Sequence, residues 1–213
     1  MSLEGRRSVN YKASMPRVSD ARERLLDSAL KLVFRSSYGG VGVGAICGDA
    51  GVQKGSFYHF FGSKRELVTE ALERFFEVEI EPMLEACLAG SDRPEDKVRR
   101  YFEAIFAFQA SEKRSSGSVP GCHFGNLAVE LGTVDPIVRK AVTSLLERVT
   151  KRLEKALAQG EEGLTKAQAR RAAAQIVAYM EGILVVAKMN NDPARVRSLA
   201  GGADALVVAA RGT

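Results

Sequence analysis

A cluster of hydrogen-bond donors could contact the phosphates and base edges of a nucleic acid: Lys54, Gly55, Ser56, Tyr58, His59 and Lys64. The first three stand at the start of a predicted short helix, where helix-turn-helix proteins usually read base edges. Tyr58 and His59 can each donate to a phosphate while the body of the ring packs in the protein. Lys64 begins the next predicted helix, where backbone N–H groups and the helix dipole also favour an anion. The residue types therefore predict an interface with double-stranded DNA.

Two short helices must position these donors. The pattern predicts helices over residues 43–50 and 54–60, joined by Gly51-Val52-Gln53. This is the helix-turn-helix arrangement, in which the second helix enters the major groove and the first braces it. A longer helix over residues 20–37, capped by Ser19, precedes the pair. We expect Phe57 and Phe61 to be core residues.

Residues 46–64 follow the pattern I-x3-A-G-V-x-K-G-S-F-Y-H-x-F-x-S-K, which resembles the N-terminal signature of TetR-family transcriptional repressors. Together with the preceding helix, the resemblance covers roughly residues 19–65. It implies a homodimer that reads a palindromic operator through its N-terminal domain and binds a small-molecule inducer in its C-terminal domain. The bound inducer would respace the two recognition helices so that they no longer match the operator.

The sequence departs from the family pattern around the first short helix. Val41-Gly42 stands where the family usually has a Thr or Ser cap, so no capping hydroxyl is expected to contact a phosphate there. Gly44 and Gly48 inside the helix each cost about 0.5–1 kcal/mol relative to alanine. We therefore expect this helix to be weakly stable. His59-Phe60 replaces the more usual His-His pair, which leaves the donor His59 intact.

Residues 121–131, with the sequence GCHFGNLAVEL, resemble a segment of one subgroup of the family, in which some members sense reactive electrophiles or small unsaturated acids. The resemblance implies that Cys122 can be a sensing thiol. Its place at the start of a predicted helix would lower the thiol pKa, and His123 is adjacent. The alternative is that Cys122 is a small apolar residue beneath a loop. Cys47 and Cys87 are expected in the core.

An inducer pocket in the C-terminal domain would be lined by apolar, aromatic and amide side chains. The candidate lining residues are Phe102, Phe106, Cys122, Phe124, Asn126, Tyr179 and Met180, with Phe75 and Met83 beside them. A helical core contains the same residue types, so the pocket is inferred mainly from the family resemblance. The alternative is a DNA-binding architectural or adaptor protein whose packed C-terminal domain takes no small molecule.

The rest of the chain has helical periodicity and no strand-like alternation. Further helices are expected over 63–88 with a kink at Pro82, from Pro94 to a polar loop at 111–121, and over 122–131, 136–158, 165–189 and 193–210. Ser63 and Glu66 fit a capping box. The expected fold is all-α, with a flexible basic arm (1–18), a helix-turn-helix domain (19–65) and a ligand-binding and dimerisation domain (66–213).

Helix 165–189 is apolar on more than one face, through residues such as Ile176, Met180 and Leu184. One covered face cannot bury all of this surface, so part of the helix should meet a second protomer. Helix 193–210 is the expected partner in a four-helix interface, as the family resemblance implies. The alternative is that helix 136–158 takes the second place.

The charge distribution supports an acidic partner for the N-terminal third. The 213-residue chain has a net charge of +5, and residues 1–74 hold 12 Lys and Arg against 8 Asp and Glu. Most of the basic excess therefore lies in the part that holds the helix-turn-helix. The arginines of the arm are either solvated or inserted into a minor groove.

Several other classes of protein are not expected. Three widely spaced cysteines and two histidines argue against a disulfide scaffold and a zinc module, and no metal or cofactor is predicted. No catalytic constellation is found, because Cys122 and His123 point about 100° apart on a helix. No apolar stretch approaches the ~18 residues of a membrane span, and the N-terminus lacks an apolar signal segment. A cytoplasmic protein without membrane contact is expected.

Overall fold

The computed structural model describes residues 18–160 and 162–212, and all of its regular elements are helices. In chain order they are α1 (Val18–Arg35), α2 (Val43–Ala50), α3 (Lys54–Phe60), α4 (Lys64–Phe75), η1 (Phe76–Ile80), α5 (Glu81–Leu88), α6 (Pro94–Ser116), α7 (His123–Leu131), α8 (Pro136–Leu157), α9 (Lys166–Met189) and α10 (Ala194–Arg211). The all-α prediction is confirmed over this part of the chain. The predicted arm lies outside the described residues, except that α1 already begins at Val18.

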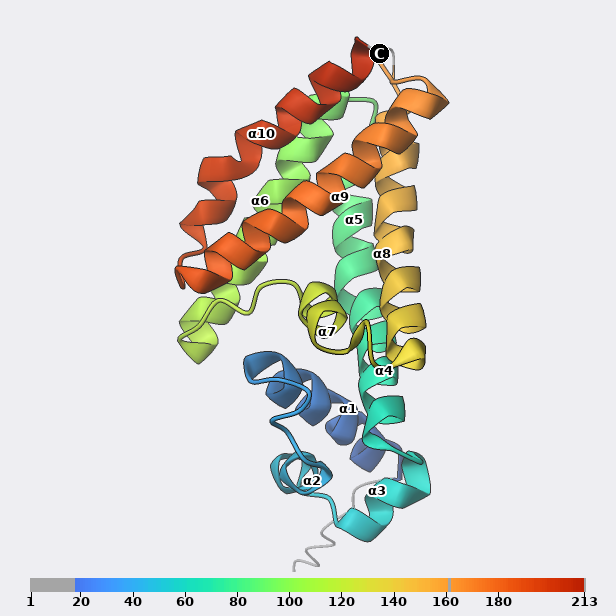
Figure 1. The fold of residues 1–213 in the computed structure, drawn as a ribbon, viewed down its shortest axis with the longest axis vertical. Coiled ribbons are helices and arrows are strands. Elements are labelled where there is room, and N and C mark those ends of the chain that lie inside the picture. The colour runs from blue at the N-terminus through green and yellow to red at the C-terminus, as the bar shows by residue number, and fades with distance from the viewer. Residues whose placement is uncertain (1–17, 161, 213) are drawn as a thin grey trace, which may run out of the picture.

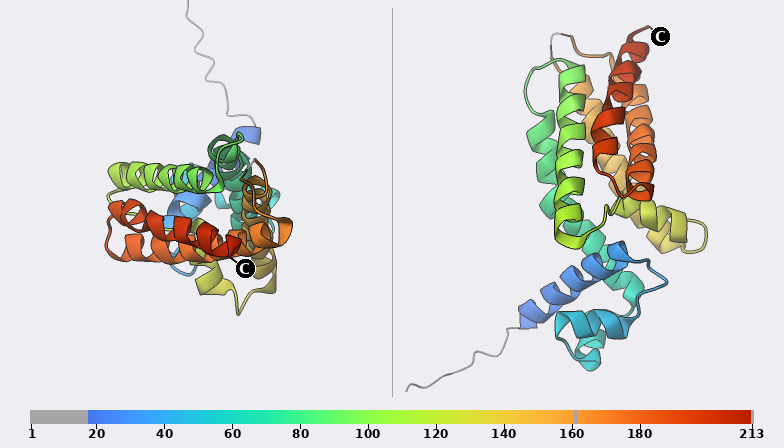
Figure 2. Two further views of the ribbon diagram at one scale, coloured as in Figure 1. Left: turned by 90° about the horizontal axis from the view of Figure 1, so that it is seen from above. Right: turned by 90° about the vertical axis from the view of Figure 1, so that its left-hand side faces the viewer.

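The helices form two lobes joined by one long helical path (Figure 1). The lower lobe holds α1, α2 and α3, with α4 packed against α1, and the upper lobe is a bundle of α5, α6, α8, α9 and α10. The path runs from α4 through η1 into α5, and α7 lies between α1 and the bundle. Figure 2 shows from the side that α2 and α3 lie at the end of the molecule away from the bundle.

The lower lobe is held together by an apolar core that α1 shares with α3 and α4. α1 buries Leu25, Ala29 and Val33, which recur every four residues on one face. α3 contributes Phe57, and the residue that follows it, Phe61, is buried as well. The prediction that these two phenylalanines are core residues is confirmed, and their burial fixes which face of α3 remains open.

The predicted loop over residues 111–121 is wrong in its first half, because α6 continues to Ser116. The side chains of Ser115 and Ser116 donate to the carbonyl of Glu112 within the helix. The helix ends at Gly117, whose φ of 81° is the left-handed conformation that glycine adopts most readily. This last turn carries polar residues on all sides, so the apolar periodicity that marks a helix in the sequence is lost before the helix ends.

The long helix predicted over residues 63–88 is interrupted near the expected place. A π-helical turn, η1, separates α4 from α5 just before Pro82, which lies in the first turn of α5. A proline has no N–H for the preceding turn and its ring crowds the carbonyl there, and a wider turn relieves both effects. The interruption lies at the point where the path passes from the lower lobe into the bundle.

Among the described residues, α9 is the one helix long and apolar enough to pass a length-and-composition test for a membrane span. It packs against both α8 and α10, and its buried residues include Ile176, Met180 and Leu184. The core helix of a helical bundle passes the same test, and α9 is a core helix of the upper lobe.

The weak stability expected of α2 leads to a prediction for Gly48, inside the helix, and for Gly51, directly after it. Gly48 has open space around its Cα, so Gly48→Ala should raise the free energy of unfolding by about 0.5–1 kcal/mol. Gly51 has a φ of 60°, so Gly51→Ala should lower it by about 1–2 kcal/mol. Chemical denaturation of both variants measures the two effects, and changes of the same sign would contradict this view of α2.

Candidate nucleic-acid interface and neighbouring pocket

α3 buries one face in the lower lobe and leaves the other open. The five predicted contact residues on this helix are all exposed: Lys54, Gly55, Ser56, Tyr58 and His59. Tyr58 is 56% exposed, while its ring meets the buried Phe57 edge-on with 5.0 Å between the ring centroids. The ring is thus supported by the core, and much of the side chain faces solvent. The structure brings these donors together on one short, rigidly packed helix.

Lys64 differs from the other predicted contacts because its ammonium group faces the protein. Its Nζ donates to the carbonyls of Tyr38 and Val41 at 2.8 and 2.9 Å, and it lies 3.9 Å from the centroid of the Tyr38 ring. Burial lowers the pKa of Lys64. The phosphate contact of Lys64 stays a prediction, and the structure adds a second task, which is to hold the turn between α1 and α2.

Ser63 caps the start of α4 as the sequence predicts, but the predicted capping box does not form in its standard arrangement. The Ser63 hydroxyl accepts from the backbone N–H of Glu66 at 3.1 Å. The Glu66 carboxylate reaches back to the N–H of Gly62 at 2.8 Å, one residue further than in a standard capping box. These bonds fix the residue at which α4 begins, shortly after the end of α3.

Ion pairs on the surface of the lower lobe fix α1 relative to its neighbours. Arg22 pairs with Glu70 of α4, and Arg74 of α4 lies 2.5 Å from Asp27 of α1. Each exposed pair contributes at most about 1 kcal/mol, so together they orient the helices more than they stabilise them.

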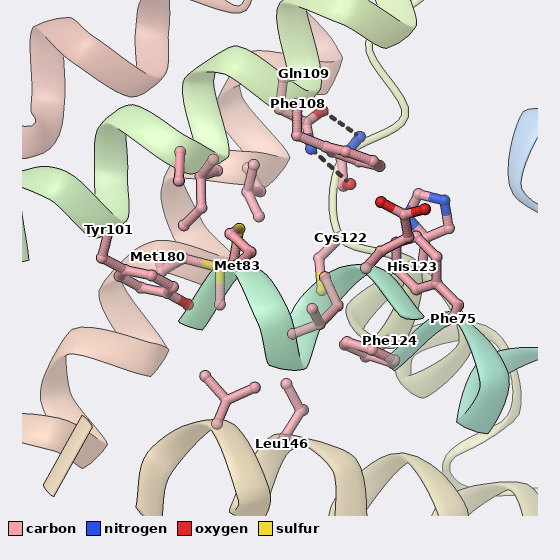
Figure 3. Close-up of a pocket in the computed structure, with 17 residues that line it drawn as sticks. Phe75, Met83, Tyr101, Phe108, Gln109, Cys122, His123, Phe124, Leu146 and Met180 are labelled. Atoms are coloured by element: carbon pink, nitrogen blue, oxygen red, sulfur yellow. Dashed lines mark hydrogen bonds between the residues drawn. The ribbon is translucent and has the colours of Figure 1, made fainter. Parts of the chain in front are cut away.

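A cavity of about 180 Å3 lies in the upper lobe close to α1 (Figure 3). Its lining comes from α4, η1 and α5 to α9, and includes Phe75, Ile80, Met83, Tyr101, Ala104, Ile105, Phe108, Phe124, Leu146, Val149, Met180 and Leu184, with the polar Glu79, Gln109, Cys122 and His123. The walls are thus mainly apolar. Among the described residues, no group of three or more His, Cys, Asp or Glu side chains could hold a metal ion.

The sequence identified part of this lining. Cys122, Phe124 and Met180 face the cavity, as do Phe75 and Met83, which were expected beside them. Figure 3 shows these five side chains converging from α4, α5 and α9 and from the start of α7, where Cys122 is the N-cap residue. The convergence depends on the packing of four helices, of which each sequence segment reveals only one face.

Four predicted residues do not line this cavity: Phe102, Phe106, Asn126 and Tyr179. Phe102 is buried, and Phe106 lies 3.6 Å from an arginine guanidinium of α10. The amide of Asn126 donates to the carbonyl of Pro120, and the hydroxyl of Tyr179 donates to a carbonyl of α10. Phe106 and Tyr179 face α10, and Asn126 instead lines a neighbouring hollow together with Cys122 and Glu181. The part of these four residues in binding an inducer stays a prediction.

Sequence reasoning missed several lining residues, and one of them had a usable signal. Gln109 continues the apolar stripe of Phe102 and Ile105 on α6, so a polar residue falls where a core residue is expected. Its amide exchanges two hydrogen bonds with the backbone of Gly121, at 3.0 and 3.1 Å (Figure 3). Gln109 therefore fixes the segment that leads into α7.

Cys122 caps α7, but its thiol is not activated in the way the sequence suggested. Its Sγ accepts from the N–H of Gly125 at 3.3 Å. Burial and the neighbouring Glu181 raise the pKa of the Cys122 thiol well above its usual value. The expectation of a lowered pKa is wrong, because loss of solvation and a nearby carboxylate outweigh the helix dipole.

His123 is a neutral side chain enclosed by aromatic rings. Its ring stacks on Phe75 with centroids 4.7 Å apart, and lies 4.1 Å from the centroid of Phe34 on α1. Burial lowers the pKa of His123 to about 3, with a further contribution from Lys188. It therefore cannot supply a positive charge to stabilise a thiolate at Cys122 near neutral pH.

The buried histidine predicts a loss of stability in mild acid. The unfolded chain takes up a proton near pH 6.5 and the folded chain does not, so folding is penalised as the pH falls below 6.5. We expect His123 to lower the free energy of unfolding by about 1.4 kcal/mol at pH 5.5 and about 2 kcal/mol at pH 5. Denaturant titrations between pH 7.5 and 5 measure this slope.

The chain offers a matched control, because its other histidine, His59, is exposed. His123→Phe should remove this component of the pH dependence, whereas His59→Phe should keep it. An equal pH slope in the His123→Phe variant and the unsubstituted protein would contradict the assignment.

Comparisons with known proteins match both lobes. Residues 25–71 match the family model of bacterial regulatory proteins, tetR family, and residues 94–201 match that of the C-terminal domain of LmrA/YxaF-like transcriptional regulators. An uncharacterised HTH-type transcriptional regulator of Lactococcus lactis is 25% identical over 81% of this chain and 86% of its own length. The HTH-type transcriptional repressor DhaR of Mycobacterium sp. is 28% identical over 66% of this chain and 67% of its own length.

Solved structures give the same fold. The crystal structure of Escherichia coli NemR in its reduced form superposes with a TM-score of 0.73 at 24% identity. The superposition covers 86% of this chain and 95% of that chain. It spans both lobes, so the arrangement of lobes described above is shared.

Proposed function

The chain belongs to the TetR family of DNA-binding transcriptional regulators, and on this premise we propose that it is a repressor that binds a palindromic operator as a homodimer and is released by a small molecule. The observation that carries the proposal is the open face of α3, where five donors stand over a buried phenylalanine. In a symmetric dimer, two such helices would meet half-sites one or more helical turns apart, about 34–36 Å per turn.

The donors divide into two groups by their place on α3. Lys54, Gly55 and Ser56 form the first turn, which enters the groove first, and we assign them to base edges. Tyr58 and His59 lie further along the helix and are assigned to phosphates. Lys64 follows at the start of α4, where its ammonium already bonds two carbonyls and has one donor left for a phosphate.

We assign the dimer interface to α9 and α10, which lie side by side on one face of the bundle (Figure 1). Large apolar side chains are exposed on these two helices: Val185, Val186, Met189, Leu199 and Val208. The outward residues of α8, the alternative partner helix, include the charged Arg139, Lys140, Glu147 and Lys151. Exposed apolar side chains on both of these helices favour a partner protomer there.

The cavity favours a small, uncharged, mainly apolar inducer. Its histidine is neutral and the amide of Gln109 is already bonded to Gly121, so no charged group is present to bind an ionic ligand except Glu79. The volume of about 180 Å3 is below the roughly 300–1,000 Å3 of pockets for drug-sized ligands. The cavity also argues against an architectural protein with a fully packed C-terminal lobe.

An electrophile is one class of inducer that this site could take, because the Cys122 thiol lines the cavity. Its raised pKa leaves little thiolate at neutral pH, so N-ethylmaleimide should modify Cys122 at least about 10-fold more slowly than free cysteine at pH 7. Mass spectrometry of time points measures the rate, with Cys122→Ser reporting the background from the buried Cys47 and Cys87. A rate equal to that of free cysteine would contradict the prediction.

The same variant tests the sensing role. If N-ethylmaleimide releases DNA through Cys122, the Cys122→Ser variant keeps its DNA in the presence of the reagent. Unchanged release in that variant would make Cys122 structural.

Selection from a random DNA library tests the proposed function as a whole. The purified protein should enrich a palindrome, and Lys54→Ala or Ser56→Ala should change the enriched bases. Lys140→Ala, which removes an exposed charge of α8, should enrich the unchanged palindrome. Failure of the unsubstituted protein to enrich any sequence would contradict the proposal.

A further inference from the structure

One short helix contacts both the cavity and the DNA-reading lobe. α7 has nine residues and lies between α1 and the upper bundle (Figure 1). Its first turn forms part of the cavity wall, and its last turn approaches the turn between α1 and α2. At about 1.5 Å per residue, the helix spans roughly 13 Å between these two contacts.

The first turn of α7 joins the cavity to α1 through His123. The imidazole lines the cavity and also lies against Phe34, near the end of α1. Phe124, the next residue, lines the cavity and packs near Phe75, with 6.2 Å between the ring centroids. A molecule that fills the cavity therefore contacts the first turn of α7.

The last turn of α7 holds the backbone of the DNA-reading lobe through Glu130. One carboxylate oxygen accepts from the N–H of Tyr38 at 2.8 Å, and the other accepts from the N–H of Gly39 at 2.6 Å. Hydrogen bonds to an ionised carboxylate are about twice as strong as neutral ones. A Cβ at position 39 would lie 3.2 Å from Glu130 Oε1, so glycine permits this close approach.

The same turn is held from its other side by Lys64. The ammonium of Lys64 bonds the carbonyls of Tyr38 and Val41, while Glu130 bonds the N–H groups of Tyr38 and Gly39. Side chains of α4 and α7 thus both hold this turn by hydrogen bonds, and the turn leads directly into α2. Because α2 braces α3, a displacement of this turn changes the position of the DNA-reading helix.

We propose that Glu130 is a positioning residue that ties the helix-turn-helix to α7, so that filling the cavity moves α2 and α3 through this helix. The inference rests on the proposed function and specifies how its two sites are coupled. When the first turn of α7 is displaced, the carboxylate of Glu130 moves with it. The two hydrogen bonds from the carboxylate to the α1–α2 turn then open, and α2 loses the support that holds it in its DNA-reading position.

Hydrogen–deuterium exchange on the full chain tests this coupling without DNA or a known inducer. The probe of cavity filling is Ala104→Phe, with Ala104→Leu as a smaller second variant, because Ala104 lines the cavity on α6. Each is measured alone and combined with Glu130→Gln, which replaces one accepting oxygen by an NH2 group. The controls are Ala107→Leu, at an exposed position of α6, and Glu147→Gln, at an exposed position of α8.

We expect Ala104→Phe to raise the exchange rate of peptides covering residues 36–43 by about 10-fold or more, since amides lose their protection when their hydrogen bonds open. Glu130→Gln should raise the rate by a similar factor, and the double variant should add little to either. The two controls should stay within about 2-fold of the unsubstituted protein. If Ala104→Phe does not fold, as judged by exchange of α8 peptides, Ala104→Leu takes its place.

Two results would overturn the inference: unchanged exchange of residues 36–43 in the cavity-filled variant, or effects of the two substitutions that multiply in the double variant. The first means that the cavity does not reach the turn, and the second means that it reaches the turn by another route. The exchange experiment contains no DNA, so the two proposals can fail separately. If the protein enriches no DNA sequence but its exchange rates change as expected above, only the proposed function is contradicted.

Discussion

Doubling the salt concentration from 0.1 to 0.2 M should weaken operator binding about 100-fold. A dimer that neutralises roughly eight phosphates releases their counterions, so the logarithm of the association constant should fall against the logarithm of salt with a slope near −7. The basic excess of the chain lies in its N-terminal third, where the donors of α3 are found. Fluorescence anisotropy with labelled operator DNA, at four or more salt concentrations, measures the slope.

A charge in the other lobe provides the control for this experiment. Lys140 is exposed on α8, away from α3, so Lys140→Ala should leave the slope unchanged. Lys64→Ala, which removes a charge assigned to a phosphate in each protomer, should make the slope less steep by about 2. Binding that is insensitive to salt would contradict the assignment of α3 to a phosphate-lined groove.

Removing one hydroxyl from each DNA-reading helix should also have a large effect. We expect Tyr58→Phe to lower operator affinity by at least about 100-fold, because a hydrogen bond to a charged group contributes about 1.5–3 kcal/mol and the dimer loses two of them. The ring keeps its edge-on contact with Phe57, and more than half of Tyr58 is exposed. The free energy of unfolding should therefore change by less than about 0.5 kcal/mol.

Tyr179→Phe serves as the matched control, because it removes the same group from the upper lobe. The hydroxyl of Tyr179 donates to the carbonyl of Leu199 at 2.9 Å, so this variant should lose about 1 kcal/mol of stability and keep its operator affinity within about 2-fold. An affinity of Tyr58→Phe equal to that of the unsubstituted protein would remove Tyr58 from the interface.

The helix-turn-helix could be predicted from the sequence because its information is local. Gly51 marks the turn, Phe57 and Phe61 mark the buried side of α3, and Ser63 marks the start of α4. Each signal depends on residues within a few positions of one another. Once the buried side of α3 is known, helix geometry predicts that the opposite side is exposed. All five contact residues predicted on this helix are indeed exposed.

The cavity could be predicted only in part because its lining is not local. Phe102 and Phe106 lie on the apolar side of α6, but α10, about 90 residues later in the chain, covers Phe106. The pKa of Cys122 likewise depends on Glu181, which α9 brings beside it. The two bonds from Glu130 to the α1–α2 turn join residues 91 and 92 positions apart, and no local pattern predicts them.

A footprint on the DNA upstream of the gene for this protein tests most directly the claim that α3 reads an operator as part of a dimer. The account predicts two protected half-sites, related by a twofold axis and separated by one or more turns of about 34–36 Å, and predicts that Tyr58→Phe loses both together. Adding a small apolar molecule that fills the cavity should also remove both. A single protected site, or protection that is the same in the Tyr58→Phe variant, would contradict the account.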